Sequence, residues 1–597
     1  MSSILLRAAP SSHECPEKHS PQPPRKSLLQ QLVILALVVI RLVKGLLIWI
    51  YRTIQLLIFS NYKNRAFEFG IKKNPVFKDN FAPIHDELYC RNLFVLKGEI
   101  PKDFMNGMYV RIGPNPQFDP LYSIHWFEGD GHLHAIEFKD GHASYRNKFV
   151  RTEKYLQEKE NGRPLTYSFF VNGINPILKY AHHYLYDRLY RGLDGPVKSG
   201  GGVANTNIIY HGGKFLALEE GHKPVEILLP NLDTVGEFTF NGKLNHNFTA
   251  HPKYDPVTGE LIFFAYGLNP RGPGLYYGVI DKNNNIVIDY EFKKEETPYM
   301  CMIHDMAITE HYSIIGFYPA IIDLTRIFQP GPPLIFDKSK PAKFAVFPRH
   351  FNGETAIQYF EIKSCMAFHY INAFETIVNE DETLITIDVC VSDSFDLNDL
   401  SSSKPYPSRF VLNLKRGQVQ EEFGQPFTFH SQDVSDSSST TAQNITTNEN
   451  MVPMGEFPVI HPSFTGKPYR YFYYSVIIEK EKSDSLLFFN EIAKFDLETK
   501  TLKRLKIPEN GKIGEVCLVP KKHESIRTPP ITSPQEEEDN VYLVTFAFHE
   551  EKNSSSLFIF DGKTMSEEPV CQIELPRRVP FGFHGQFFPA TTFEYEH

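Results

Sequence analysis

Short apolar segments separated by turn residues make up most of this chain. From about Asn74 to the C-terminus, apolar and aromatic runs alternate with Asp-Gly or Asn-Gly pairs. Such a pair between two strand-like runs is the strongest short signal for a β-hairpin. The pattern predicts strands at Lys214–Leu218, Leu261–Tyr266, Ser313–Tyr318, Tyr471–Val476, Val541–Ala547 and Ser556–Asp561. The turn pairs are Asp130-Gly131, Asp140-Gly141, Asn172-Gly173, Asn241-Gly242, Asn352-Gly353, Asn510-Gly511 and Asp561-Gly562.

Helical periodicity is rare in the same region, and only Pro176–Arg191 favours a helix. Many short strands with few helices are typical of a sandwich, a barrel array or a propeller. Residues 74–597 are too many for one sandwich, and a propeller keeps many strands in one body without long exposed edges. We therefore predict an all-β propeller over residues 74–597. No repeat is regular enough to give the number of blades.

The N-terminal 60 residues follow a different pattern. Residues 1–26 are polar and contain proline, which predicts disorder. Residues 27–60 are strongly apolar, but their longest uncharged stretch, Leu28–Ile40, is shorter than the roughly 20 residues that span a bilayer. The polar interruptions recur at intervals of 11 residues, which is close to three helical turns. They therefore share one narrow stripe of a helix: Gln30, Arg41, Arg52, Lys44 and Gln55.

A very apolar helix with a thin basic stripe is typical of a membrane anchor that lies in one leaflet. Its arginine and lysine side chains would reach the lipid headgroups. A tilted or kinked span and a cleaved signal peptide are the alternatives, and the second is disfavoured because no small-residue cleavage site follows. We expect a membrane-associated protein whose catalytic domain is cytosolic.

The net charge bears on the partners that the protein can have, and the cysteine content bears on whether its thiols are oxidised. The net charge of −9 and the lack of any Lys/Arg-rich tract argue against a nucleic-acid partner. The seven cysteines form no Cys-x-x-Cys pair and are odd in number, which indicates reduced thiols. Two low-complexity stretches, Ser431–Glu449 and Lys521–Asn540, are predicted to be surface loops. The sequence indicates no obligatory protein partner.

Four histidines lie inside short apolar or aromatic runs, where histidine is least expected. A buried imidazole leaves a ring nitrogen that needs a partner. One such residue is usually a core histidine bonded to a carbonyl, whereas four indicate convergence on a transition metal that binds neutral imidazole. Separate core histidines and a shared metal both remain open at this point. The four are His251, His304, His369 and His584.

Three glutamates lie in similarly apolar surroundings: Glu220, Glu456 and Glu515. A metal-bound imidazole needs an acceptor for its other N–H group, and a buried carboxylate serves that purpose. The alternative for each is a strand-end glutamate that faces water.

The chain resembles the carotenoid cleavage oxygenases in an ordered series of motifs from about residue 75 to the C-terminus. Each motif is weak alone, but the set in this order is highly specific. The motifs are Tyr109-Val-Arg-Ile-Gly-Pro-Asn-Pro116, His125-Trp-Phe-Glu-Gly-Asp-Gly131, Phe248-Thr-Ala-His-Pro252, Met302-Ile-His-Asp-Met-Ala-Ile308, Phe368-His-Tyr-Ile-Asn-Ala-Phe-Glu375, Gly455-Glu-Phe-Pro458 and Pro580-Phe-Gly-Phe-His-Gly585.

This resemblance implies a seven-bladed propeller with one Fe(II) per chain on its axis. It implies His251, His304, His369 and His584 as iron ligands. It implies Glu220, Glu456 and Glu515 as acceptors behind them, with Glu219 as the competing register. The implied reaction adds O2 across one C=C bond of a carotenoid or apocarotenoid and gives two carbonyl products. The membrane lipid would then supply the substrate.

One departure and one ambiguity accompany the resemblance. The family's Asp-Gly-Asp-Gly-Met pattern reads Glu128-Gly-Asp-Gly-His132 here, and we expect His125, His132 and His134 to form a solvated turn. Lys154 resembles the lysine of stilbene-cleaving relatives, although a solvated lysine is the more favoured interpretation. A stilbene-cleaving oxygenase, a retinoid isomerase of the same fold and a carotenoid-binding protein without turnover are the alternative functions.

Overall fold

The computed structural model divides the chain into two compact units, Met1–Asn61 and Tyr62–His597. It describes the following residues: 14 positions between 35 and 53, then 78–119, 124–164, 202–269, 272–323, 334–397, 399–420, 425–428, 451–478, 487–521 and 538–593. The segment 1–26, the helix expected at Pro176–Arg191, the loop at Ser431–Glu449 and most of Lys521–Asn540 lie outside them.

The first unit is helical wherever it is described. Helical residues occur from Leu35 to Thr53, and the Thr53 hydroxyl donates to the Trp49 carbonyl at 2.9 Å. Every large apolar side chain described between positions 35 and 50 is exposed, including Trp49 at 64%. Among the described residues, no helix has both the length and the hydropathy that crossing a bilayer requires.

In the second unit, seven antiparallel sheets of four or five strands follow one another in the described chain. We name them blades 1–7. Blade 1 contains β1 (Tyr89–Cys90), β5 (His142–Phe149), β4 (Gly131–Lys139), β3 (Gly107–Pro114) and β33 (Gly585–Pro589). Blade 2 contains β6 (Asn207–His211), β7 (Lys214–Leu218), β8 (Val225–Leu228) and β9 (Asp233–Glu237). Blade 3 contains β10 (Lys253–Tyr254), β11 (Leu261–Asn269), β12 (Gly272–Ile280) and β13 (Ile286–Glu291).

The later blades have the same form. Blade 4 contains β14 (Met306–Ile308), β15 (Tyr312–Phe317), β18 (Ala342–Pro348) and β19 (Gln358–Ile362), with a side pair of β16 (Ala320–Ile322) and β17 (Leu334–Phe336). Blade 5 contains β20 (Met366–Asn379), β21 (Glu382–Ser392), β22 (Tyr406–Asn413), β23 (Gln418–Val419) and β24 (Gln425–Pro426). Blade 6 contains β25 (Gly455–Val459), β26 (Tyr471–Ile477), β27 (Phe489–Asp496) and β28 (Thr501–Lys506). Blade 7 contains β2 (Val95–Gly98), β32 (Cys571–Glu574), β31 (Ser554–Asp561), β30 (Val541–His549) and β29 (Cys517–Pro520).

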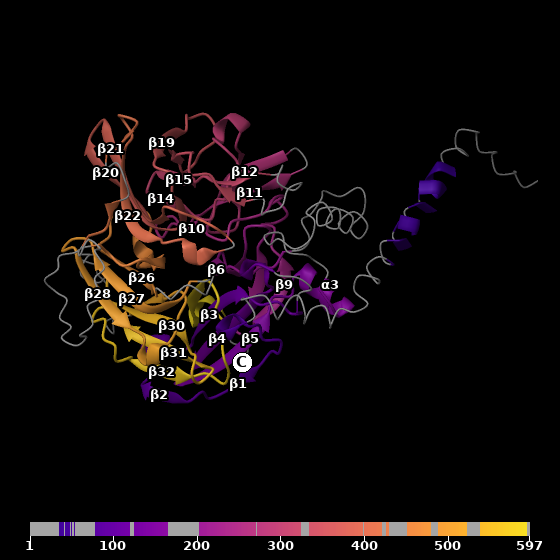
Figure 1. Ribbon diagram of the computed structural model, residues 1–597, viewed down its shortest axis with the longest axis vertical. Helices are drawn as coiled ribbons and strands as arrows, with labels where there is room; N and C mark the ends of the chain where they lie inside the picture. The colour runs from indigo at the N-terminus through magenta and orange to yellow at the C-terminus, as the bar shows by residue number, and fades with distance from the viewer. Residues whose placement is uncertain are drawn as a thin grey trace, which may run out of the picture. The chain divides into compact units, whose positions relative to one another are not determined.

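The ring of blades is closed by both ends of this unit. β33, near the C-terminus, pairs with β3 of blade 1, and β2, near the start of the unit, pairs with β32 of blade 7. In Figure 1 the yellow strands β30–β32 accordingly lie next to the indigo strands β3–β5. Closure by strands from opposite ends of the chain leaves few free sheet edges.

Seven buried layers of the described core each lie between two neighbouring blades, and an eighth, smaller cluster contains Phe81, Phe488, Phe548 and Phe581. One layer joins blade 4 to blade 5 through residues such as Phe344 and Phe410, and another joins blade 7 back to blade 1 through Leu557 and Ile136. Because apolar residues face both sides of each sheet, every blade is stabilised by both of its neighbours. This arrangement is the expected all-β fold, a seven-bladed β-propeller.

The strands expected from the hydropathy pattern are present with small shifts at their ends, but the turn pairs are used differently. Of the pairs that the structure describes, only Asp140-Gly141 forms a two-residue hairpin turn, with φ of 51° and 80°, between β4 and β5. The predicted pair Asn172-Gly173 lies outside the described residues. Asp130-Gly131 instead leads into β4. One unexpected helix, α3 (Glu153–Asn161), begins after Thr152, whose hydroxyl accepts from the Tyr155 N–H, and ends at Gly162, whose φ is 64°.

Candidate metal centre

The four histidines singled out from the sequence meet at one point. One ring nitrogen from each lies within 4.8 Å of the other three, and the four side chains are buried, that of His304 with 10% exposure. Each comes from a different blade: His251 precedes β10, His304 precedes β14, His369 lies in β20, and His584 precedes β33. Inner edge strands of four blades therefore deliver one imidazole each.

The three glutamates come from the other three blades. Glu220 follows β7 of blade 2, Glu456 lies in β25 of blade 6, and Glu515 precedes β29 of blade 7. Each blade of the propeller thus contributes one residue, a histidine or a glutamate, to the same centre.

Hydrogen bonds to these carboxylates orient the imidazoles. His369 Nδ1 lies 2.6 Å from Glu456 Oε2, and His584 Nδ1 lies 2.8 Å from Glu515 Oε1. A carboxylate is an acceptor, so in both rings Nδ1 carries the proton. Their Nε2 atoms are then unprotonated, and the lone pair of each can bind a cation.

Glu220 is the acceptor for His304. Its carboxylate lies against His304 Nδ1. The neighbouring Glu219 faces elsewhere, and its Oε1 accepts from the Val203 N–H at 2.7 Å. The competing register at this position is therefore wrong.

The centre has the properties of an ion site. His304 Nε2 and His369 Nε2 face each other at 3.2 Å, and His251 Nε2 is buried without a hydrogen-bond partner. With Nδ1 protonated, the two facing Nε2 atoms present lone pairs that repel unless a cation lies between them. The donor set of four neutral imidazoles suits a borderline transition-metal ion.

Electrostatics favour neutral imidazoles at two of the four histidines. Burial, followed by repulsion from the other rings, holds the pKa of His251 and His369 well below the usual range. His304 is the exception, because the Glu220 carboxylate outweighs the effect of burial and raises its pKa. Burial also raises the pKa of Glu456 to about 7.

Aromatic rings pack against the imidazoles on two sides. Phe368 lies 5.0 Å from His304, measured between ring centroids, and Phe457 lies 5.4 Å from His369. Phe457 has a φ of 56°, in the left-handed region, within a bulge between Glu456 and Val459. A bulky residue rarely adopts that conformation, and such strain is commonly found at functional sites. Here the bulge presents Glu456 and the Phe457 ring to the histidines together.

Two expectations about other polar residues are wrong. His125, His132 and His134 are not a solvated turn, because they are buried and 7%, 1% and 3% exposed. Their partners come from elsewhere in the fold: Leu397 O for His125, Asn147 Nδ2 for His132 and Tyr145 Oη for His134. Among the described residues, only the four central histidines form a group suited to a metal.

Lys154 is likewise not a solvated residue, because its side chain is only 11% exposed. Its Nζ donates to Asp130 Oδ1 at 2.7 Å and to Glu158 Oε2 at 3.0 Å. Burial alone would lower its pKa, but the two carboxylates raise it. The ammonium group is therefore engaged by two anions and is not poised to activate a phenol.

Comparisons with known proteins agree with this architecture. Residues 81–589 match the family model described as RPE65, retinal pigment epithelial membrane protein. Carotenoid 9,10(9',10')-cleavage dioxygenase 1 of Pisum sativum is 35% identical over 535 residues, covering 85% of this chain and 88% of the relative. The corresponding enzyme of Arabidopsis thaliana is 34% identical with the same coverage of both chains.

Solved structures share the fold at lower sequence identity. Lignostilbene dioxygenase of Pseudomonas brassicacearum matches with a TM-score of 0.68 at 24% identity, covering 87% of this chain and 99% of the other. Apocarotenoid oxygenase of Synechocystis matches with a TM-score of 0.65 at 24% identity, covering 85% and 97%. The chain therefore belongs to the RPE65/carotenoid oxygenase family.

Proposed function

We propose that this protein is an Fe(II)-dependent dioxygenase that cleaves a C=C bond of a carotenoid or apocarotenoid. O2 contributes one oxygen atom to each of the two carbonyl products. The observation that carries the proposal is the cluster of four buried imidazoles, three of them with a carboxylate at Nδ1. The relatives named as carotenoid cleavage dioxygenases, at 34–35% identity over most of both chains, support the substrate class.

His251, His304, His369 and His584 would hold the iron, which would supply the site at which O2 is bound and activated. Four neutral ligands would leave the 2+ charge of the ion uncompensated by the atoms that bind it. Glu220, Glu456 and Glu515 fix the tautomer of three of the histidines. Their negative charge lies one hydrogen bond away from those histidines and would compensate the charge of the ion. A protein of the same fold binds a metal, since one Synechocystis apocarotenoid oxygenase structure, with a TM-score of 0.64, is described as cobalt-substituted.

A row of aromatic rings provides a route for an apolar polyene. It runs from Phe368, beside His304, to Phe395 at 5.5 Å and on to Phe336 at 6.5 Å, measured between centroids. Phe336 and Phe395, with Leu397, line a hollow of about 510 Å³. Half of the residues that line it are polar, among them Asp337 and Lys338, so it is the apolar side of the hollow that suits a hydrocarbon chain. We propose that this hollow is where substrate enters, so that the protein selects the bond by positioning it.

We further propose that the apolar N-terminal helix lies in one leaflet of a membrane and that the catalytic domain is cytosolic. The exposed apolar side chains from Leu35 to Ile50 support this, because such a surface is unfavourable in water. A chain that starts at Asn61 should lose membrane binding and cleave liposomal carotenoid more slowly. Full membrane association and an undiminished rate would contradict the proposal.

Replacing one central histidine tests the metal role. His304→Ala should abolish both stoichiometric iron binding and turnover, since three imidazoles and a cavity would replace the four-histidine site. His211→Ala is the matched control, because His211 is also buried but bonds to a backbone carbonyl, that of Asp281. Retained iron and activity in His304→Ala would show that the assignment is wrong.

A further inference from the structure

Asp305 is a buried carboxylate, 3% exposed, that directly follows His304. Both of its oxygens are fully engaged. Oδ1 accepts from the Met306 N–H at 2.7 Å, and Oδ2 accepts from the Tyr370 N–H at 2.9 Å. Lys253 Nζ lies 2.7 Å from Oδ1 and 3.0 Å from Oδ2.

Each partner of this carboxylate borders a different histidine of the centre. Lys253, in β10 of blade 3, is two residues beyond His251. Tyr370, in β20 of blade 5, is the residue after His369. Asp305 itself joins His304 to the start of β14 in blade 4.

One carboxylate therefore connects three of the four histidine-bearing segments at the level of the imidazoles. The fourth segment is held separately, because Glu515 bonds both His584 Nδ1 and the Gly585 N–H. Buried charge-assisted hydrogen bonds to backbone groups are among the strongest in proteins, and their loss leaves unpaired N–H groups.

We propose that Asp305 is a positioning residue that sets the spacing of the imidazoles of His251, His304 and His369, and that metal affinity and coordination geometry depend on it. The proposal rests on the metal-binding role of the four histidines argued above. Asp305 does not touch the ion or the substrate and acts only through the segments that it connects.

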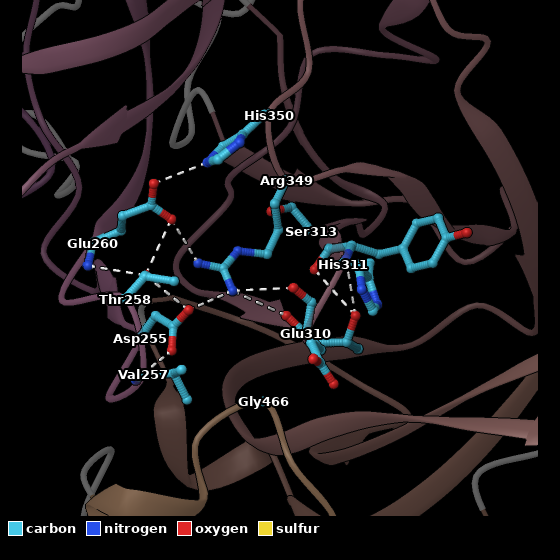
Figure 2. A network of polar contacts seen from close by, with 12 residues as sticks. Asp255, Val257, Thr258, Glu260, Glu310, His311, Ser313, Arg349, His350 and Gly466 are labelled. Carbon is cyan, nitrogen blue, oxygen red and sulfur yellow. Dashed lines mark hydrogen bonds and ion pairs between the residues drawn. The ribbon is translucent and has the colours of Figure 1, made fainter.

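A second tier of polar contacts joins the same three blades at residues farther along the chain from the histidines, and Figure 2 shows the part of it around Arg349. Arg349 Nη1 donates to Asp255 Oδ2 at 2.7 Å and to the Glu310 carbonyl at 3.2 Å. Glu375 Oε1 accepts from the His311 N–H at 2.7 Å. Asp255 lies four residues beyond His251, and Glu375 lies six residues beyond His369.

This outer tier predicts how a variant of Asp305 behaves. The blades stay connected through Arg349 and Glu375 when the inner contact is weakened. A change at Asp305 should then alter the histidine cluster without separating the blades.

Asp305→Asn tests the proposal in the full-length protein. Asparagine has one acceptor oxygen, so its NH2 group must face either the Met306 or the Tyr370 N–H, and Lys253 loses its anion. We expect Fe(II) and Co(II) affinities, measured by chelator competition, to fall about 10–100-fold, as for other residues that support metal ligands. The visible absorption bands of the Co(II) form should also shift, because they report ligand geometry.

Asp496→Asn is the matched control. Asp496 is also buried and ion-paired, with Arg470, and accepts the N–H groups of Glu498 and Thr499. It ends β27, which carries none of the four histidines. This variant should lose thermal stability and keep the wild-type Co(II) affinity and spectrum.

Lys253→Met provides the test if Asp305→Asn does not fold. It keeps the two backbone N–H groups that donate to Asp305 and removes only the connection to the His251 segment, so a smaller loss of affinity is expected. The proposal would be overturned if the folded Asp305 variant, or Lys253→Met, kept the wild-type metal affinity and spectrum. It would also be overturned if Asp496→Asn lost as much metal affinity as Asp305→Asn. A wild-type protein that binds neither ion would overturn the proposed function and this inference with it.

Discussion

Glu515 holds the segment that carries His584 through both of its oxygens. Oε1 lies 2.8 Å from His584 Nδ1, and Oε2 accepts the N–H of Gly585 at 2.9 Å. The carboxylate thus fixes the ring and the backbone that carries it. The same residue pair connects blade 7 to blade 1, where the chain closes the propeller.

This relationship predicts the effect of Glu515→Gln. The amide cannot accept at both positions, so either the ring or the backbone loses its partner. Iron affinity should fall about 10–100-fold, measured as iron per chain after dialysis against a graded chelator. Glu538→Gln is the control, since that buried carboxylate accepts only the N–H groups of Arg470 and Tyr471. Equal iron content in Glu515→Gln and wild type would contradict the assignment.

Lys154→Met separates a structural from a catalytic role for Lys154. Removing the ammonium group leaves Asp130 and Glu158 buried next to each other without a cation, so the free energy of unfolding should fall by about 3–5 kcal/mol. Chemical denaturation measures this change. At denaturant concentrations too low to unfold the variant, the ratio of carotenoid to stilbene turnover should be unchanged. Selective loss of stilbene cleavage would support the alternative that Lys154 activates a phenol.

The buried histidine His132 predicts acid sensitivity. Burial, aided by Arg577, lowers its pKa to about 3. The unfolded chain takes up a proton near pH 6.5 and the folded chain does not, so stability is full above about pH 6.5 and declines as the pH falls toward 3. At pH 5 this one residue should lower the free energy of unfolding by about 2 kcal/mol.

His132→Gln should remove that cost, because the Gln oxygen can replace Nε2 as the acceptor for Asn147. The measurement is urea denaturation at pH 7 and pH 5 for both proteins, with iron-free samples so that metal loss does not contribute. A variant whose stability falls by as much as wild type between these pH values would contradict the pKa assignment.

The aromatic route predicts a change in selectivity at Phe395. Phe395→Ala widens the passage between Phe336 and Phe368 without contacting any of the four histidines, so iron content should be unchanged. The distribution of cleavage positions should broaden, because the polyene is positioned less tightly. Chromatography of the products measures this. An unaltered product distribution and rate would show that substrate takes another path.

Period-two hydropathy predicted the strands, and imidazoles in apolar runs singled out the four histidines, because both are local signals. The convergence of those histidines on one centre was implied by the family resemblance and not by the local pattern. Blade number was not predictable from periodicity, because the blades share a topology and not a repeated motif. The choice between Glu219 and Glu220 depends on which side of the chain faces the axis after β7. No local pattern specifies that.

The mistaken expectations concern polar residues whose partners lie on other strands. His132 and His134 looked solvated, but Asn147 and Tyr145 on the neighbouring strand β5 satisfy them inside the blade. Asp305 was not singled out, although a lone carboxylate in the run Met-Ile-His-Asp-Met-Ala-Ile was a visible signal. A buried charge in such a run needs partners, and only the fold shows that they border two other histidines.

Product analysis under labelled oxygen tests the central claim most directly. The iron-loaded, full-length protein is incubated with 18O2 and, separately, β-carotene, a β-apocarotenal, resveratrol and a retinyl ester, and the products are identified by mass spectrometry. We predict paired carbonyl fragments from a carotenoid or apocarotenal, each with one labelled oxygen when exchange with water is controlled. Iron-bound protein that yields only phenolic aldehydes, only isomerised retinoid or no product would contradict the account.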